Sequence, residues 1–467
     1  MTVAHRVHLA TLGCARNDVD SEELAARLES GGFTLVEDPD AAETVVVNTC
    51  GFVEQAKKDS IDMILAAADL KDTGSTRAVV AVGCLAERYG TQLAAELPEA
   101  DAVLGFDSYT DIAERLRSIL AGHAPASHEP RDRRQLLPLA PAARPGRGGV
   151  VVPGHAQLPE GLAPATGPRV LRRRLGSGPS APLKIASGCD RRCAFCAIPA
   201  FRGSYLSRPV GDLVAEARWL VESGVKEVFL VSENTSSYGK DLGEGRLEQL
   251  LAELSAVDGL EWIRVSYLQP AEVRPSLLQA MLGTAKVVPY FDLSFQHASA
   301  GVLRAMRRFG DHESFLDLIA QIRSQAPQAG IRSNVIAGFP GESEADVEVL
   351  RQFILEARLD VLGVFGYSDE EGTQAAQLPG HLDESEVESR RELLADVALE
   401  VCEQRAEARV GEAMDVLVED PEQGRGPHQA PETDGIVELR GSSWPMGRIV
   451  SATVVDSNGI DLIAEAV

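Results

Sequence analysis

The chain has 467 residues, of which 44% are hydrophobic, and a mean hydropathy of −0.06, which predicts two or three soluble globular domains. Its formal net charge of −25 disfavours binding to bare nucleic acid and favours a basic protein partner. The sequence has no apolar run long enough to cross a membrane and no secretory signal pattern at its start. We therefore expect a cytoplasmic protein without membrane contact, whose seven cysteines are free thiols.

Residues 1–120 alternate strand-like and helix-like runs, in an order that predicts a parallel α/β domain with right-handed crossovers. Ligands of such sheets lie beyond the carboxyl ends of the strands. Cys14, Cys50 and Cys84, here called the dispersed triad, each stand at the end of a strand-like run, so we expect them to converge. The strand-like runs are 5–13, 43–50 and 76–84, and the helical runs are 18–32, 54–71 and 88–100.

Residues 121–180 have a different composition, rich in Pro, Gly, Ala and Arg. This composition predicts a flexible insertion or linker without a packed core. The segment is locally basic, which fits a solvated tether better than a docking segment.

Residues 181–408 again alternate strands and amphipathic helical runs. About six β/α units predict a partial barrel that is open, because a complete barrel of this kind has eight. Cys189, Cys193 and Cys196, here called the clustered triad, follow the first of these strands, where barrel active sites form. The expected strands are 183–188, 227–232, 262–267, 290–295, 332–338 and 362–367.

Residues 409–467 contain short alternating strands separated by Gly, Pro and Asp. They predict a small antiparallel β-barrel of OB-like size. By contrast, Cys402 stands alone on a helical run just before this segment, and we interpret it as a buried structural thiol.

The clustered triad has C-x3-C-x2-C spacing, so three thiolates lie within eight residues. Three thiolates can bind three irons of a four-iron cluster and leave the fourth iron open to a small ligand. A zinc site is the alternative, but zinc usually takes paired C-x2-C or Cys/His sets, and no nearby His completes one.

The run around the clustered triad resembles the signature of the radical S-adenosylmethionine enzymes. The resemblance implies that the open iron of a 4Fe–4S cluster chelates S-adenosylmethionine, which is then cleaved to a 5′-deoxyadenosyl radical. It also implies that Phe195 shields the cluster and that Gly338 and Glu342, in a Gly-rich strand-end motif, lie near the adenosine. Taken alone, the glycine motif is only a turn.

Other polar residues at the predicted barrel mouth are weaker candidates for this cofactor. Glu233 and Asn234 follow the second strand, where a polar loop is an equally good interpretation. Arg202 and Arg208 are candidates for binding a carboxylate of the cofactor or substrate, and solvated arginines are at least as good an interpretation.

An N-terminal three-cysteine domain, a radical barrel and a small C-terminal barrel together resemble the methylthiotransferases. The C-terminal barrel resembles a TRAM domain. In this family the dispersed triad would hold an auxiliary 4Fe–4S cluster, whose open iron carries the sulfur to be transferred. The resemblance implies insertion of sulfur into a C–H bond, capped by a methyl group, with S-adenosylmethionine supplying both radical and methyl. A reductase and a sulfur donor are implied partners.

Several runs, including Gln296–Ser299, resemble the branch that modifies an aspartate of the twelfth small-subunit ribosomal protein. From Val410 onward, three basic side chains (Arg425, Arg440 and Arg448) stand against eleven acidic ones, which suits a basic protein better than RNA. The alternatives are the branch that modifies tRNA adenosines and, in another class, a non-catalytic iron–sulfur factor in ribosome assembly. Contact with ribosomal RNA through the basic insertion stays open.

Overall fold

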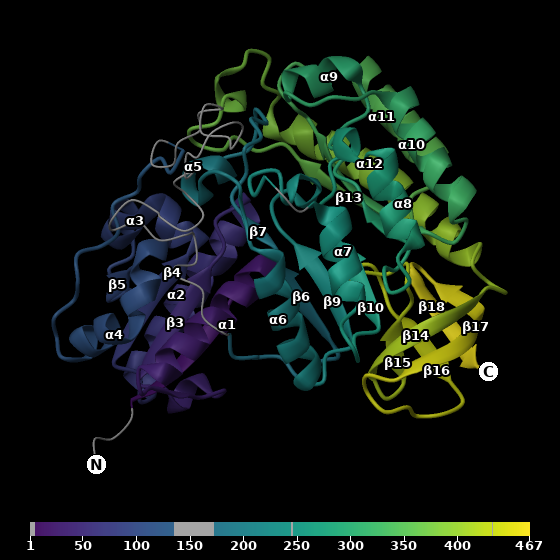
Figure 1. Cartoon of the computed structure of the whole chain (residues 1–467). Helices are drawn as coiled ribbons and strands as arrows, with labels where there is room; N and C mark the ends of the chain where they lie inside the picture. Colours follow the sequence, from purple (N-terminus) through teal and green to yellow (C-terminus); the bar gives the residue numbers. More distant parts are fainter. Residues whose placement is uncertain (1–4, 135–171, 244–245, 432) are drawn as a thin grey trace, which may run out of the picture. The chain divides into compact units, whose positions relative to one another are not determined.

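The computed structural model describes residues 5–134, 172–243, 246–431 and 433–467, which form two compact units (Figure 1). The first unit comprises Met1–Ser177, Ser187–Arg191 and Ala197–Leu206, and the second unit comprises the remaining residues. Among the described residues, no helix combines the length and apolar character that a membrane span requires.

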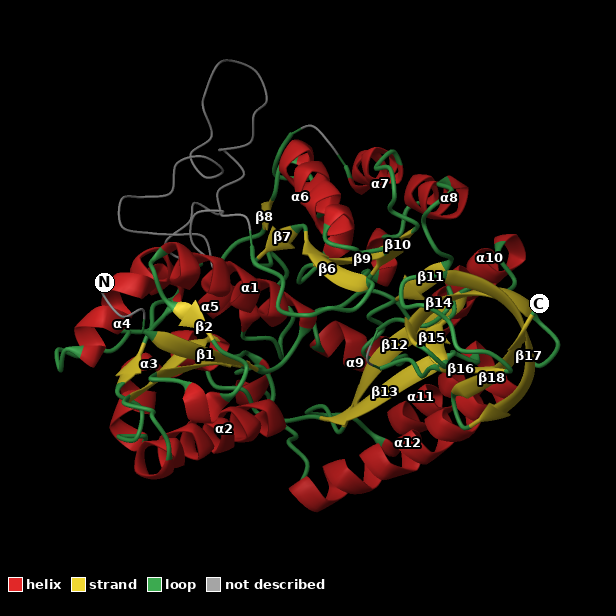
Figure 2. Cartoon of the chain, turned by 90° about the horizontal axis from the view of Figure 1, so that it is seen from below, coloured by secondary structure: helices red, strands yellow, loops and turns green. Residues whose placement is uncertain are grey.

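The first unit is built on a parallel sheet with strand order β2-β1-β3-β4-β5, of which β1 and β2 are labelled in Figure 2. The three expected strands and the helices after them are confirmed, whereas β2 and β5 are too short for a periodic pattern to indicate them. The elements are β1 (Arg6–Thr11), α1 (Ala15–Ser30), β2 (Thr34–Leu35), β3 (Thr44–Thr49), α2 (Glu54–Thr73), β4 (Ala78–Gly83), α3 (Cys84–Glu96), β5 (Ala102–Val103) and α4 (Ile112–Leu120).

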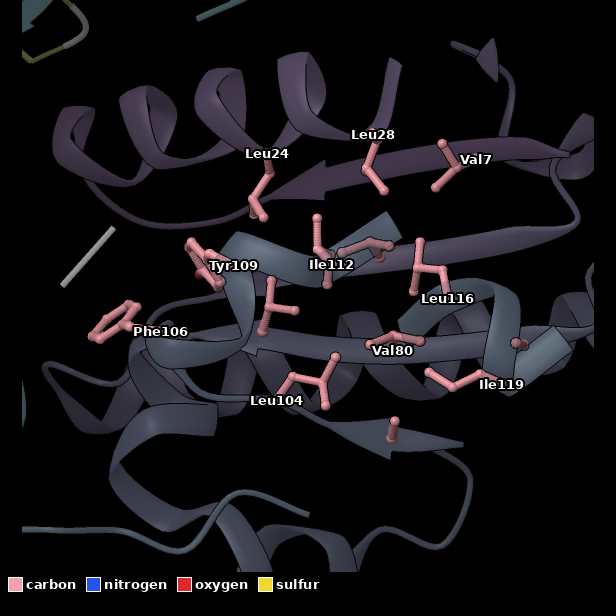
Figure 3. Close-up of a cluster of buried hydrophobic side chains, with 14 of the residues drawn as sticks. Val7, Leu24, Leu28, Val80, Leu104, Phe106, Tyr109, Ile112, Leu116 and Ile119 are labelled. Carbon is pink, nitrogen blue, oxygen red and sulfur yellow. The ribbon is translucent and has the colours of Figure 1, made fainter. Parts of the chain in front are cut away.

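Helices cover both faces of this sheet, which explains why β3 and β4 are apolar without alternation. On one face, Leu24 of α1 and Leu116 of α4 pack with Val80 of β4 (Figure 3). On the other face, Ile64 of α2 and Leu93 of α3 pack against the alternate side chains of β3 and β4. The buried sheet is a rigid base for the loops at its carboxyl edge.

One helix begins earlier than the sequence indicates. The expected helical run starts at residue 88, but α3 starts at Cys84, directly after β4, and is kinked at Gly90. The backbone at Gly90 is non-helical, and a Cβ there would lie 2.0 Å from the carbonyl oxygen of His128. The strand therefore passes into the helix without a loop, which places Cys84 in the first helical turn.

Two arginines in the described ends of the predicted insertion are packed within the first unit rather than solvated. The Nε of Arg133 lies 2.6 Å from a carboxylate oxygen of Glu87, and the Nε of Arg172 lies 3.2 Å from one of Glu22. Both arginines are buried. Residues 135–171, on which the rest of the expected tether falls, lie outside the described residues.

The second unit contains the partial barrel, and its six expected strands are confirmed. All are parallel, in the orders β10-β9-β6 and β11-β12-β13, and parallel bridges such as Leu268 to Leu293 join the two sets. The strands are β6 (Ser180–Lys184), β9 (Glu227–Val231), β10 (Trp262–Val265), β11 (Tyr290–Asp292), β12 (Gly330–Ala337) and β13 (Val361–Gly366).

Helices alternate with these strands along the chain, as a β/α architecture requires. They are α6 (Val210–Glu222), α7 (Leu247–Ser255), α8 (Pro275–Gly283), α9 (Ala300–Ala305), α10 (His312–Gln325), α11 (Glu344–Ala357) and α12 (Glu384–Glu407). Near the clustered triad, β7 (Ala186–Ser187) and β8 (Leu206–Ser207) pair with each other and flank α5 (Ile198–Arg202) in the sequence.

The C-terminal segment closes into the expected small barrel, in the order β14-β15-β16-β18-β17. Its neighbouring strands are antiparallel except β16 and β18, which are parallel. The strands are β14 (Ala413–Asp420), β15 (Gln423–Arg425), β16 (Val437–Arg440), β17 (Ile449–Asn458) and β18 (Asp461–Ala466).

A buried ion-pair network joins this barrel to the β/α arc within the second unit. Arg425 of β15 and Arg264 of β10 both pair with Glu227 of β9, with 2.6 Å between the Nε of Arg264 and the carboxylate. All three side chains are almost fully buried. Such a network favours one docking geometry, because loss of Glu227 would leave the buried charge of Arg264 without its ion-pair partner.

Candidate functional site

The dispersed triad lies together at the carboxyl edge of the first sheet. Cys14 caps α1 after β1, Cys50 follows β3, and Cys84 begins α3 after β4. Because β1, β3 and β4 are parallel neighbours, their carboxyl ends share one edge, and the expected convergence is confirmed. At Gly13 a Cβ would lie only 2.9 Å from the sulfur of Cys50, so the turn before Cys14 passes directly over that thiol.

Side-chain amides join the carboxyl ends of β1 and β3 to the first turn of α1. The amide nitrogen of Asn17 donates to the carbonyl oxygens of Leu12 (2.7 Å) and Thr49 (3.1 Å). The amide nitrogen of Asn48 donates to the carbonyl oxygen of Asn17 at 3.0 Å. These bonds are mostly buried, so the triad is supported by a preorganised frame.

Two arginines contact the thiols of the dispersed triad. The Nε of Arg16 lies 3.4 Å from the sulfur of Cys14, and an Nη of Arg202 lies 3.1 Å from the sulfur of Cys84. Burial acts to raise the pKa of the Cys14 thiol, but the charges of Arg16 and Arg202 lower it below its usual value. Cys14 is therefore the member most readily present as a thiolate.

The other two thiols are held in the neutral form by their surroundings. Burial raises the pKa of Cys50, and it raises that of Cys84 to about 11. Metal binding requires thiolates, and the charge of bound iron would replace the protons that burial favours. The donor set of three thiols is of the kind that binds the irons of a 4Fe–4S cluster. In a cluster each thiolate binds a different iron, so the sulfurs need not converge on one point.

The clustered triad lies between β7 and α5 in the sequence. In the first unit the amide of Cys189 donates to the carbonyl oxygen of Gly203 at 3.0 Å. In the second unit the amide of Cys196 donates to the carbonyl oxygen of Cys193 at 3.2 Å. An Nη of Arg308 lies 3.7 Å from the sulfur of Cys193. The local sequence gives no sign of Arg308, because it stands more than a hundred positions away.

Phe195 is half-buried in the second unit and packs against an apolar cluster that includes Met306, Phe339 and Ala375. The neighbouring Ala194 is fixed through both backbone groups, which bond to Met306 (3.0 Å) and Ala375 (2.8 Å). This packing gives Phe195 a defined apolar setting, as a shielding residue needs.

The residues after β9 are packed rather than solvated. Asn234 is buried, and its amide nitrogen donates to the hydroxyl of Ser237 at 2.8 Å. Glu233 is half-buried beside it. The loop therefore lies at the carboxyl end of the second barrel strand in a packed conformation.

The Gly-rich turn after β12 is closed by Glu342. Its carboxylate accepts hydrogen bonds from the amides of Gly338 (2.9 Å) and Phe339 (3.3 Å) and pairs with Arg390 at 3.1 Å. Gly338 has φ +78, and a Cβ there would lie 2.7 Å from a side-chain carbon of Val387. Gly338 and Glu342 therefore determine the conformation of the turn, and the Glu342 carboxylate binds groups of the protein itself.

Arg202 and Arg208 are not solvated, which corrects one interpretation of them. Arg208 is buried and pairs with Glu216 at 2.5 Å, within the second unit. Arg202 is buried in the first unit beside Cys84 and Asp20. Cys402 is buried on α12, and burial raises its pKa to about 11, in agreement with a structural thiol.

Family models match three separate parts of the chain. The uncharacterised protein family UPF0004 matches residues 6–105, the radical SAM superfamily matches residues 183–354, and the TRAM domain matches residues 410–467. The partial β/α barrel and its C-x3-C-x2-C run thus define a radical S-adenosylmethionine enzyme. Enzymes of this superfamily bind S-adenosylmethionine and a 4Fe–4S cluster.

Similar proteins identify the family within this class. The chain is 65% identical to the "ribosomal protein uS12 methylthiotransferase RimO" of Cutibacterium acnes, which covers 98% of this chain and 97% of that protein. It is 63% identical to the protein of that name from Kineococcus radiotolerans, over 98% of this chain and 96% of that protein. It is 59% identical to the protein of that name from Streptomyces coelicolor, over 100% of this chain and 97% of that protein. The chain belongs to the RimO family of radical S-adenosylmethionine methylthiotransferases.

A solved structure supports the fold. The radical S-adenosylmethionine methyltransferase TsrM from Kitasatospora setae matches with a TM-score of 0.53 and 14% identity, covering 78% of this chain and 73% of that one. At this identity the likeness concerns the fold alone.

Proposed function

We propose that this chain inserts sulfur and a methyl group at the β-carbon of an aspartate in ribosomal protein uS12. The observation that carries the proposal is the presence of two cysteine triads, each at the carboxyl end of parallel strands. The full-length similarity to uS12 methylthiotransferases supplies the substrate. We place the reaction in the cytoplasm, where reduced thiols are available for cluster assembly.

The clustered triad would hold the 4Fe–4S cluster that cleaves S-adenosylmethionine. The resident cluster supplies the electron, and the protein binds, orients and shields the cofactor. In this assignment Phe195 would shield the cluster, and the turn of Gly338 and Glu342 would bind near the adenosine. Glu233 and Asn234 contribute polar groups at the mouth of the barrel.

The dispersed triad would hold a second 4Fe–4S cluster that delivers sulfur. Support comes from the three thiols gathered at one sheet edge, the amide frame around them and the two adjacent arginines. A reductase and a sulfur donor are needed as partners, since the chemistry consumes both electrons and sulfur.

The C-terminal barrel supports a basic protein substrate. Arg425 is buried in an ion-pair network, so it adds no charge to the surface. The exposed basic residues of the described barrel are then Arg440 and Arg448. The exposed acidic residues are Asp415, Asp420, Glu422, Glu438, Asp456 and Glu465. This surface repels RNA phosphates and attracts a Lys- and Arg-rich protein.

The proposal is tested with the full-length protein after both clusters have been rebuilt. Incubation with uS12, S-adenosylmethionine and a reductant should increase the mass of uS12 by one methylthio group in place of one hydrogen. Fragmentation should locate the addition on an aspartate. An unchanged uS12 mass would contradict the proposal, and absence of 5′-deoxyadenosine would favour a non-catalytic assembly factor.

A further inference from the structure

Arg202 connects three buried groups of the first unit through one nitrogen. An Nη of its guanidinium lies 3.1 Å from the sulfur of Cys84, 3.2 Å from a carboxylate oxygen of Asp20 and 3.4 Å from the amide oxygen of Asn17. Asp20 is fully buried, and the exposed fractions of Arg202 and Cys84 are 6% and 8%. The guanidinium therefore acts on the thiol with little screening by water.

The position of this guanidinium is fixed by its surroundings. Its central carbon lies 5.2 Å from the centre of the Phe106 ring, a cation–π distance. Arg202 ends α5, whose neighbouring Phe201 is part of the core of the first unit. The helix is closed by Gly203, whose amide donates to the carbonyl oxygen of Pro199 at 3.1 Å. Arg202 is therefore held through its backbone in α5 and through its guanidinium on Phe106, so its charge has a defined position relative to Cys84.

Asp20 reduces the electrostatic effect of Arg202 on the dispersed triad. Since the same nitrogen contacts both Asp20 and Cys84, the carboxylate partly neutralises the field at the sulfur. The two residues have opposite effects on any negative charge held by the three thiolates. Arg16 adds a second cation next to Cys14, but it is only half-buried, so water weakens its effect.

We propose that Arg202 is a positioning residue that stabilises the reduced state of an iron–sulfur cluster on the dispersed triad, and that Asp20 limits this stabilisation. The inference rests on the proposed function, in which this triad holds the second cluster. In the one-electron reduction, a low-potential reductant gives one electron to the cluster, which gains one negative charge. No bond forms or breaks. A nearby buried cation lowers the energy of the more negative state.

The test measures the reduction potential of this cluster alone. The full-length chain with Cys189→Ala, Cys193→Ala and Cys196→Ala retains only the dispersed triad, and its cluster is titrated with dithionite and followed by electron paramagnetic resonance. At the midpoint of this parent, Arg202→Gln should lower the ratio of reduced to oxidised cluster about tenfold, equivalent to a shift of about 59 mV. Asp20→Asn should shift the potential in the opposite direction.

Two further variants separate charge from structure. Arg202→Lys keeps the positive charge, so its potential should remain closer to that of the parent than the potential of Arg202→Gln. Arg16→Gln removes a half-exposed cation and should give a smaller shift than Arg202→Gln. A purely structural role for Arg202 would alter cluster content without this ordering of potentials.

Each outcome decides one part of the account. If the parent binds no iron, the second cluster of the proposed function is wrong. If clusters form but Arg202→Gln and Asp20→Asn leave the potential unchanged, the second cluster stands and the role of Arg202 is wrong. Should Arg202→Gln fail to fold, Asp20→Asn decides alone, since an unchanged or lowered potential would overturn the inference.

Discussion

Gly13 and Cys50 lie in direct contact at the carboxyl edge of the first sheet, where a Cβ on Gly13 would lie 2.8 Å from the Cβ of Cys50. Gly13 has φ +101, a conformation that residues with a side chain rarely adopt. The glycine before Cys14 is thus required both by the backbone and by the neighbouring thiol. It brings the first two cysteines of the dispersed triad together.

Gly13→Ala should therefore displace Cys50 and destroy the second cluster. We expect the iron content of the rebuilt protein to fall by about half, while S-adenosylmethionine cleavage continues at the clustered triad. Gly32→Ala is a matched control, because Gly32 has φ +84 but no atom within 4 Å of an added Cβ. Iron analysis and 5′-deoxyadenosine release check both variants, and full iron content in Gly13→Ala would contradict the predicted packing.

The two cysteine triads should have separable functions. Replacing the clustered triad by alanine should abolish 5′-deoxyadenosine formation, because the cluster that reduces S-adenosylmethionine is lost. Replacing the dispersed triad should leave this cleavage and stop sulfur insertion into uS12. Chromatography of the nucleoside and mass spectrometry of uS12 measure the two activities. Equal loss of cleavage in both variants would refute this division.

Glu342→Ala should weaken both the Gly-rich turn and the binding of S-adenosylmethionine. The change removes the acceptor for the buried amides of Gly338 and Phe339, at a cost of about 1–3 kcal/mol for each group left unpaired. If the complex with S-adenosylmethionine loses about 1.4 kcal/mol of binding free energy in this way, its Kd rises tenfold. Calorimetric titration measures the affinity. Glu344→Ala, at an exposed position next to the turn, is the control and should bind normally.

Glu227 should make the second unit sensitive to acid. Burial acts to raise the pKa of Glu227, but the charges of Arg264 and Arg425 outweigh it and hold the pKa at about 2, below its usual value of 4.5. The folded pKa is thus lower than the unfolded one. This carboxylate contributes its full stabilisation above pH 4.5 and loses it as the pH falls towards 2, an effect of about 3 kcal/mol.

Glu227→Gln should remove this contribution, leaving the buried Arg264 without its carboxylate partner and Arg425 paired with Glu419 alone. We expect a loss of about 3–5 kcal/mol at neutral pH and a shallower decline in melting temperature between pH 4.5 and 2. Thermal melts followed by circular dichroism measure both. Glu438→Gln, at an exposed position on the same barrel, should melt like the unaltered protein at each pH. Parallel pH profiles of Glu227→Gln and the unaltered protein would contradict the role of Glu227.

Hydrophobic patterns predict the large elements of this fold well. Strands such as β3 and β4 are buried on both faces, so their apolar runs stand out in the sequence. The sheet edge then predicts where Cys14, Cys50 and Cys84 meet, because parallel strands place their ends together. The parallel pairing of β16 with β18 depends on barrel closure, which no local pattern expresses.

The electrostatic partners of the site are much harder to predict. Arg202 contacts Cys84 and Asp20, residues more than a hundred positions away, and hydropathy alone favours a solvated arginine. Composition fails in the same way at Arg133, which lies in an Arg- and Pro-rich run yet pairs with the buried Glu87. Such contacts follow from the assembled fold rather than from neighbouring residues.

The central claim is tested most directly by competition between two substrates. The full-length protein with both clusters rebuilt is incubated with equal amounts of uS12 and tRNA, with S-adenosylmethionine and reductant, and both products are analysed by mass spectrometry. The account predicts a methylthiolated aspartate in uS12 and unmodified tRNA adenosines. Methylthioadenosine in the tRNA together with unmodified uS12 would contradict it.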